Sequence, residues 1–155
     1  MSLKNILYEM ISKSNVDFSV QEFNRYLMIM VKKSKKTNEL QKKINSLAQA
    51  ALGYDNIDAL KVLLVDGDVK AQINYNNYYL LRFPLFYGTE NTISFLLENG
   101  FYDKWYGLDN FIKTYDFNNK GYFLLQYNAR QEKSKLQEQL KKCRENIKPH
   151  NYLKI

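Results

Sequence analysis

Few side chains in this chain are of the types that carry enzymatic chemistry. There is one histidine, His150, five residues from the end of the chain, and one cysteine, Cys143. A zinc site or a Ser–His–Asp triad needs more ligands, or a better placed imidazole, than these residues offer. Asp66 and Asp68 flank Gly67 as in a metal loop, but no calcium-type series of ligands follows them. No glycine-rich phosphate-binding motif occurs either. We therefore expect a non-enzymatic protein without a metal or a cofactor.

The aromatic residues are the strongest functional signal in the sequence. The chain has 13 Tyr and 9 Phe, which crowd the stretches "NYNNYY" (residues 74–79) and "FYDKWY" (residues 101–106). Tyrosine and tryptophan supply large contact areas with few rotatable bonds, so they dominate the energetics of protein interfaces. The alternative is that they seal joints between irregular helices. As clusters, they favour a protein-binding surface.

The positive charge is placed unevenly along the chain. The net charge is +7, of which residues 32–43 carry +5 and residues 129–155 another +5, while residues 44–128 carry −3. The run "KKSKK" predicts a solvated loop, a contact with phosphate or an acidic protein surface, or a nuclear-localisation patch in a eukaryotic host. A nucleic-acid-associated protein that uses these basic flanks is the alternative function. The lysines of the run are Lys32, Lys33, Lys35 and Lys36.

Length and composition predict a single globular domain over residues 1–155. The chain is 45% hydrophobic, which is too apolar for a disordered protein. The longest apolar run, "YLMIMV" (residues 26–31), is far shorter than the roughly 20 residues of a membrane span. No signal-peptide pattern precedes it, and a single cysteine suits a reducing compartment. We expect a cytoplasmic protein that does not enter a membrane.

Apolar spacing predicts three helices in the first 52 residues. Ser19, followed by Glu22 three residues later, is a capping box that begins the second helix. Thr37 or Asn38 can cap the third. The predicted apolar faces are Leu3, Ile6, Leu7, Met10 and Ile11 in the first helix, Val20, Phe23, Leu27, Met30 and Val31 in the second, and Ile44, Leu47, Ala48, Ala51 and Leu52 in the third.

The middle of the chain contains an internal repeat. "ALKVLLVDGD" (residues 59–68) returns as "TISFLLENGF" (residues 92–101), and "SLAQAAL" (residues 46–52) returns as "YLLRFPL" (residues 79–85), so both segments recur with a period of 33 residues. Asn56 and Thr89 precede the two second helices as N-caps, and Gly67 and Gly100 follow them, where we expect left-handed C-caps. Each unit is predicted to contain a helix, a tight turn, a second helix and an extended connection.

This pattern resembles the ankyrin repeat, which has the same period and the same pair of helices. The resemblance covers about residues 44–107. The family's Thr-Pro-Leu-His motif is replaced by "SLAQ" (residues 46–49) and "YLLR" (residues 79–82), and its Gly-His by "DN" (residues 55–56) and "GT" (residues 88–89). The resemblance implies a short all-α solenoid with divergent capping helices. Residues 1–43 would form a helical cap or degenerate repeat, and residues 108–155 a degenerate repeat followed by a long basic helix.

The resemblance also implies where a partner would bind. In an ankyrin-like stack the connections project as fingers, and the first helices line a concave face. Tyr75, Asn76 and Tyr78 would then lie on one finger, Phe86 and Tyr87 at the end of the adjoining helix, and Tyr102, Trp105 and Tyr106 on the next finger. We expect a protein-recognition module for a partner with an acidic surface. In a phage, a virus or an intracellular bacterium it would act as an effector in the host cytoplasm that inhibits or redirects a host protein.

The last part of the chain, from Gly121 to Lys148, predicts one long helix. Leu136, Leu140, Cys143 and Ile147 are spaced by four, three and four residues, as in the seam of a coiled coil. Such a helix can cap the apolar face of the last repeat. It can also dock a partner or pair with a second copy of the chain, which makes self-association a further hypothesis.

Overall fold

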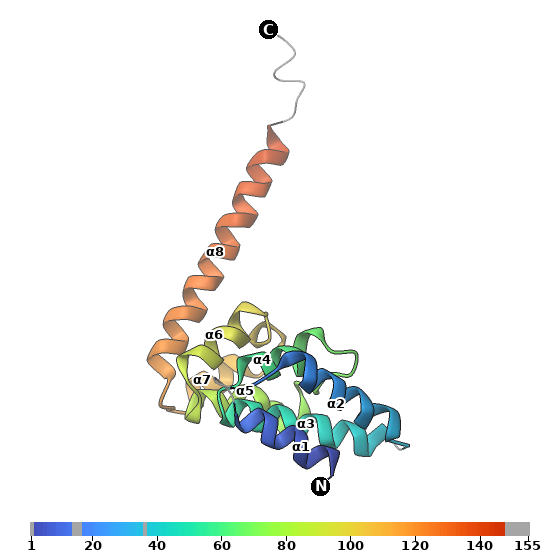
Figure 1. Cartoon of the computed structure of the whole chain (residues 1–155). Coiled ribbons are helices and arrows are strands. Elements are labelled where there is room, and N and C mark those ends of the chain that lie inside the picture. Colours follow the sequence, from blue (N-terminus) through green and yellow to red (C-terminus); the bar gives the residue numbers. More distant parts are fainter. Residues whose placement is uncertain (1, 14–16, 36, 148–155) are drawn as a thin grey trace. The chain divides into compact units, whose positions relative to one another are not determined.

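The structure, a computed structural model, describes residues 2–13, 17–35 and 37–147. Within these ranges the chain is all-helical and contains no strand, which confirms the prediction of an all-α fold (Figure 1). The chain divides into two compact units, residues 1–120 and residues 121–155. No helix in the described ranges is long and apolar enough to cross a membrane.

The first unit is built from pairs of helices that follow one another along the chain. Each helix packs against its partner in the pair, α1 on α2, α3 on α4 and α5 on α6. The first helices of the pairs contact one another in the order α1, α3, α5, and the second helices in the order α2, α4, α6 (Figure 1). The elements are α1 (Leu3–Ser12), α2 (Val20–Lys33), α3 (Thr37–Gly53), α4 (Ile57–Lys61) with a π-helical turn (Val62–Asp66), α5 (Tyr75–Tyr87), α6 (Glu90–Glu98), a 3-10 turn (Tyr102–Lys104), α7 (Leu108–Thr114) and α8 (Lys120–Asn146).

The predicted N-caps of α2, α4 and α6 are confirmed, whereas Thr37 and Asn38, the candidates for α3, lie within that helix. The side-chain oxygens of Ser19, Asn56 and Thr89 each accept a hydrogen bond from the backbone N–H three residues further on, at 3.2, 3.0 and 3.3 Å. Each cap satisfies one of the backbone donors that a helix leaves unpaired at its beginning. These local bonds explain why α2, α4 and α6 begin where they do.

The two glycines of the repeat end their helices in different ways. Gly100 has a φ of 74°, so the predicted left-handed C-cap is confirmed there. Gly67 has a φ of −70°, so the same prediction is wrong at that position. The reason is the π-helical turn, in which the Gly67 N–H donates to the carbonyl of Val62 at 2.9 Å. A Cβ at Gly67 would lie 2.4 Å from that oxygen, so glycine is required for a close approach of the backbone and not for its φ.

The turn between α3 and α4 is hydrogen-bonded to the helices on both sides of it. Asn56 Nδ2 donates to the carbonyl of Ile11 at the end of α1, at 3.1 Å, in buried surroundings. Asp55 Oδ1 accepts from the hydroxyls of Thr89 and Thr92 at the start of α6, at 2.6 and 2.7 Å. Two adjacent residues therefore join three successive helix pairs.

Buried positions recur once per period of the repeat along the second helices. Leu27, Leu60 and Ile93 occupy one such position and are at most 2% exposed. The next recurring position, at Met30, Leu63 and Leu96, is also buried. The periodic core thus extends upstream to α2, beyond the residues in which the repeat is easily seen in the sequence.

The second unit contributes α8, which confirms the predicted long C-terminal helix. Phe123 and Tyr127 stack on one another along it, with ring centroids 5.5 Å apart. The four residues of the predicted seam are exposed: Leu136 by 59%, Leu140 by 57%, Ile147 by 55%, and Cys143 as well. His150 lies outside the described residues.

Candidate functional site

The first turn of α5 has the opposite handedness to the rest of the helix. Asn76, Asn77 and Tyr78 have φ values of 49°, 53° and 60°, and the helix becomes right-handed after them. The left-handed region costs an L-residue about 1–2 kcal/mol, and asparagine tolerates it better than tyrosine does. This segment is the first of the two predicted fingers. Its conformation therefore requires support from other parts of the chain.

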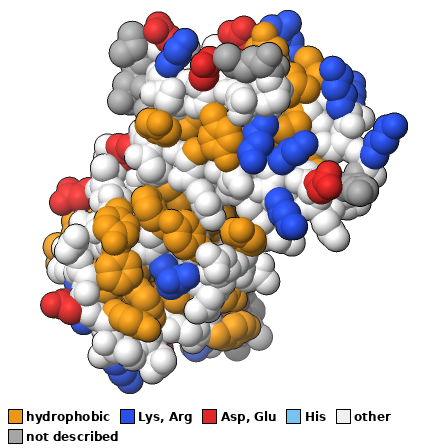
Figure 2. Space-filling model, turned by 90° about the horizontal axis from the view of Figure 1, so that it is seen from below, with side chains coloured by type: hydrophobic (Ala, Val, Ile, Leu, Met, Phe, Trp, Pro, Cys, Tyr) orange, Lys and Arg blue, Asp and Glu red, His pale blue; other side chains and the backbone are white. Residues whose placement is uncertain are grey.

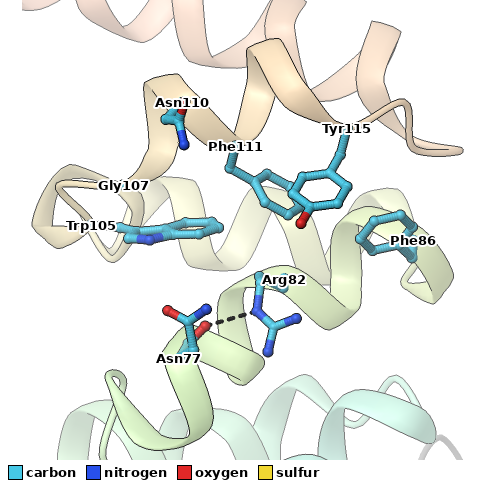
Figure 3. Close-up of a pocket in the computed structure, with 8 residues that line it drawn as sticks. All are labelled: Asn77, Arg82, Phe86, Trp105, Gly107, Asn110, Phe111 and Tyr115. Atoms are coloured by element: carbon cyan, nitrogen blue, oxygen red, sulfur yellow. Dashed lines mark hydrogen bonds between the residues drawn. The ribbon is translucent and has the colours of Figure 1, made fainter.

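Arg82, one turn further along α5, supplies part of that support. Its Nε donates to the carbonyl of Asn77 at 2.7 Å (Figure 3). Its Nη2 donates to the carbonyl of Asn76 at 2.9 Å. The guanidinium carbon also lies 5.9 Å from the centroid of the Tyr79 ring. These bonds satisfy carbonyls of the left-handed turn and hold the guanidinium in one orientation.

Trp105 provides the second support. Its indole stacks on the ring of Tyr78, with centroids 5.5 Å apart and planes 17° apart. It also meets the ring of Phe111, with centroids 5.0 Å apart. Trp105 is only 7% exposed. A Cβ at Gly107 would lie 3.0 Å from the indole nitrogen, so the absence of a side chain there leaves room for the indole.

The loop after α7 is hydrogen-bonded to the end of α5. Asn119 Nδ2 donates to the carbonyls of Pro84 and Gly88, both at 2.9 Å. Asn118 Nδ2 donates to the carbonyl of Phe86 at 3.0 Å. These bonds fix α7 and its loop against α5 and bring their aromatic rings together. Phe111 thereby contacts Phe86, Tyr115 and Phe117, with ring centroids 6.0, 4.9 and 5.6 Å away.

These contacts border a half-open pocket of about 320 Å³ between α5 and α7. Four of its eight lining residues are aromatic, and the guanidinium of Arg82 lies across from the rings of Phe111 and Tyr115 (Figure 3). Figure 2 shows hydrophobic side chains gathered on one face of the molecule around a basic one. The pocket is lined by Asn77, Arg82, Phe86, Trp105, Gly107, Asn110, Phe111 and Tyr115.

The junction one period of the repeat earlier has a polar counterpart of the Tyr78–Trp105 contact. Asn45 and Gln72 lie one period of the repeat before Tyr78 and Trp105. Asn45 Oδ1 accepts from the backbone N–H of Gln72 at 2.9 Å, and Asn45 is 1% exposed. A cavity of about 260 Å³ lies beside this pair, lined by Asn38, Gln41, Lys42, Asn45, Gln72 and Tyr75. The same positions of the period thus hold hydrogen-bonding side chains at one joint and stacked rings at the next.

Several of the residues predicted to bind a partner meet at these cavities. Phe86 and Trp105 line the pocket, Tyr78 stacks against its wall, and Tyr75 lines the smaller cavity. Asn76 lies in the left-handed turn. Tyr87 and Tyr106 are 76% and 101% exposed and line neither cavity.

Tyr102 does not belong to a binding surface, and its assignment as a partner-binding residue is wrong. It is 1% exposed, and its hydroxyl donates to the carbonyl of Leu81 at 2.9 Å. Burial raises the pKa of its phenol well above the ordinary value for tyrosine. The 3-10 turn that begins at Tyr102 places this side chain in the core instead of on a finger.

Sequence reasoning missed six residues that line the pocket: Asn77, Arg82, Gly107, Asn110, Phe111 and Tyr115. Phe111 had a usable signal, because it lies one period of the repeat after Tyr78. In the sequence, Arg82 stands out only as a departure from the ankyrin pattern. No signal in the sequence marks Asn110 or Tyr115, which reach the pocket through the packing of α7.

The described residues of the predicted electrostatic contact, Lys32, Lys33 and Lys35, lie elsewhere in the first unit. Lys32 and Lys33 are in the last turn of α2, where a positive charge suits the helix dipole. Lys35 lines a shallow hollow with Thr37, Asn38, Glu39 and Lys42, and Lys36 lies outside the described residues. In Figure 1 the junction of α2 and α3 and the helix α7 lie at opposite ends of this unit. Lys32, Lys33 and Lys35 therefore do not join the aromatic pocket.

Across the described residues, no group of His, Cys, Asp and Glu side chains is arranged to hold a metal ion. Comparisons with models of protein families, with curated proteins and with solved structures give no match to this chain. The resemblance to ankyrin repeats therefore remains a prediction.

Proposed function

We propose that the protein is a non-catalytic recognition module that binds a segment of another protein in the pocket between α5 and α7. The observation that carries this proposal is the composition of the pocket, in which four aromatic rings surround one guanidinium. Buried aromatic anchors and arginine are the residues that most often dominate the affinity of protein interfaces. Phe86 and Trp105, which the sequence had marked for this role, are among the rings.

The proposed scaffold is a short ankyrin-like stack. Two features support it: the order of helix contacts in the first unit, and the recurrence of buried positions once per period from α2 to α6. In such a stack each unit contacts only its neighbours, and the connections between units are free to specialise. The aromatic joint at Tyr78 and Trp105 would be such a specialised connection.

Affinity capture from lysate of the source organism, with and without nuclease, tests this function. The informative pair of variants is Phe86→Ala, which removes a wall of the pocket, and Tyr87→Ala, which removes the exposed neighbouring ring. We expect a discrete protein that is retained after nuclease treatment, lost with Phe86→Ala and kept with Tyr87→Ala. Circular dichroism of both variants checks that the fold is intact. Captured material that is lost after nuclease treatment and is unaffected by Phe86→Ala would instead support nucleic-acid binding by the basic flanks.

Self-association through α8 is a second candidate function. Leu136, Leu140 and Ile147 are each more than half exposed and follow the spacing of a coiled-coil seam. A helix with such a seam gains stability when the apolar side chains are covered by a second helix. The oligomeric state of the full chain in solution decides this point.

A further inference from the structure

We propose that Arg82 receives the carboxylate of an aspartate or glutamate side chain of the bound segment. This inference rests on the proposed function and specifies the chemistry that the pocket recognises. An arginine carries five N–H donors in a planar fork. Two of those of Arg82 are engaged, by the carbonyls of Asn77 and Asn76. Within the described chain, the two N–H groups of Nη1 and one of Nη2 have no acceptor, so the outer edge of the fork is available.

The charge of Arg82 also lacks a counterion from the described part of the chain. None of the ion pairs there involves Arg82, and none of the residues that line the pocket is acidic. The side chain is partly buried among aromatic rings. A charge in such surroundings is less screened than in open water, so an incoming anion is attracted more strongly. An arginine and a carboxylate can then form two parallel charge-assisted hydrogen bonds.

The rest of the lining favours a peptide over a phosphate-bearing ligand. Arg82 is the one basic residue among the described residues that line the pocket, whereas a phosphate group has more oxygens to satisfy than one open guanidinium edge can serve. The amides of Asn77 and Asn110 can each donate and accept, which suits the N–H and C=O groups of a peptide backbone. The rings of Trp105 and Phe111 can cover an apolar side chain next to the acidic one.

The neighbouring cavity favours an acidic residue within a chain over a free carboxyl terminus. Lys42 and Tyr75 place a second cation and a further ring beside Asn45, at the equivalent junction of the preceding unit. A segment that continues past Arg82 toward this cavity would meet both cations. A chain that ended at Arg82 would leave the smaller cavity unused.

The single tryptophan of the chain makes the test direct. Trp105 lines the pocket, so its fluorescence and its indole N–H resonance report on this site alone. The probes are two acetylated and amidated peptides, Gly-Glu-Phe-Gly and Gly-Gln-Phe-Gly, together with a Gln-Phe peptide that has a free carboxyl terminus, and AMP. We expect the Glu peptide to shift the indole signal saturably and to bind about tenfold more tightly than the Gln peptide.

Two variants of Arg82 separate charge from folding. Arg82→Gln should reduce the preference for the Glu peptide to about onefold, and Arg82→Lys should keep part of it, because lysine retains the charge without the fork. The comparison of Glu and Gln peptides on the unaltered protein requires no variant, so the proposal can be judged even if Arg82→Gln unfolds the left-handed turn.

Several results would overturn the inference. Equal binding of the Glu and Gln peptides, or no binding of either, would show that no carboxylate is recognised. Tighter binding of the free terminus would identify a different carboxylate, and tighter binding of AMP would identify a nucleotide. The proposed function fails separately, when the partner captured from lysate is insensitive to Phe86→Ala.

Discussion

The ring of Tyr78 and the indole of Trp105 stack with 5.5 Å between their centroids, and they join the left-handed start of α5 to the segment before α7. Aromatic pairs of this kind contribute about 0.5–1.5 kcal/mol beyond the area they bury. We expect a double-mutant cycle with Tyr78→Ala and Trp105→Ala to give a coupling of this size in urea unfolding. Tyr78→Ala also changes the backbone preference at position 78. This effect is the same with and without Trp105, so it cancels from the coupling energy.

Tyr106 provides the control for this cycle, because it neighbours Trp105 in sequence and is fully exposed. The cycle of Tyr78→Ala with Tyr106→Ala should show a coupling of at most about 0.3–0.5 kcal/mol, as for independent sites. Equal couplings in the two cycles would mean that the stack contributes nothing specific.

A second prediction concerns Asp55, whose Oδ1 accepts two hydroxyl hydrogen bonds from the start of α6. Asp55→Ala should lower the free energy of unfolding by about 1–3 kcal/mol, because both threonine hydroxyls lose their acceptor and Thr92 is buried. Alanine also tolerates a φ of 55° less well than aspartate does. Asp55→Asn keeps an oxygen and the tolerance for this φ, so its effect should be clearly smaller. Chemical unfolding monitored by circular dichroism measures both.

Gly67 and Gly53 form a matched pair for a third prediction. A methyl group at Gly67 would meet the carbonyl of Val62 at 2.4 Å, whereas one at Gly53 would meet nothing within 4 Å. Gly67→Ala should therefore destabilise the protein by about 1–3 kcal/mol, as overpacking against the backbone does. Gly53→Ala should be neutral or stabilising by up to about 1 kcal/mol, because alanine suits a helix better than glycine. Thermal unfolding of the two variants gives the comparison, and a harmless Gly67→Ala would contradict the close approach.

A fourth prediction follows from the buried hydroxyl of Tyr102. Burial raises the pKa of this phenol in the folded state above the value of about 10 that it has when unfolded. The unfolded state therefore loses its proton first, so the stabilisation is fully present below about pH 10 and declines as the pH rises further. For this one group the decline is about 1.4 kcal/mol per pH unit.

Tyr102→Phe isolates this contribution. At neutral pH it should cost about 1–3 kcal/mol, because the Leu81 carbonyl loses its donor in a buried site. Above pH 10 its stability should fall less steeply than that of the unaltered protein. Urea unfolding at several alkaline pH values provides the slopes, and identical slopes would show that Tyr102 ionises without unfolding.

A fifth prediction addresses the exposed seam of α8. If the seam pairs two chains, Leu140→Glu should shift the protein toward monomer in sedimentation experiments over a range of concentrations. Gln139→Glu adds the same charge at the adjacent position outside the seam, so it should leave the mass distribution unchanged. A wild-type chain that is monomeric at all concentrations would remove self-association from consideration.

The parts of the fold that sequence reasoning predicted are those that depend on local interactions. Ser19, Asn56 and Thr89 cap their helices through bonds that span three residues, so residue type and spacing were sufficient. Gly67 was misjudged because a terminating glycine looks the same in sequence whether it adopts a left-handed φ or admits a neighbouring carbonyl. The π-helical turn that brings the Val62 carbonyl close has no sequence signature of its own.

The pocket was predicted only in part because it depends on contacts between distant segments. The sequence marked Phe86 and Trp105 as aromatic surface residues but gave no sign that Phe111 of α7 would contact both of them. Arg82 gains its role from carbonyls in a turn whose conformation is held by that same arginine and by the Tyr78–Trp105 stack. The assignment of Tyr102 to the binding surface was wrong because composition alone does not distinguish an exposed tyrosine from a buried one.

The left-handed turn at residues 76–78 has a consequence for the chirality of the amino acids that suit it. Its φ and ψ angles mirror those of an ordinary helical turn, so they are the angles that D-amino acids favour. Asn76 is exposed and binds Arg82 only through its backbone carbonyl. A chemically synthesised chain with D-asparagine at this position would keep that hydrogen bond and relieve the steric cost. Three successive residues next to the pocket thus form a stretch of backbone that is better suited to mirror-image amino acids than to those the ribosome supplies.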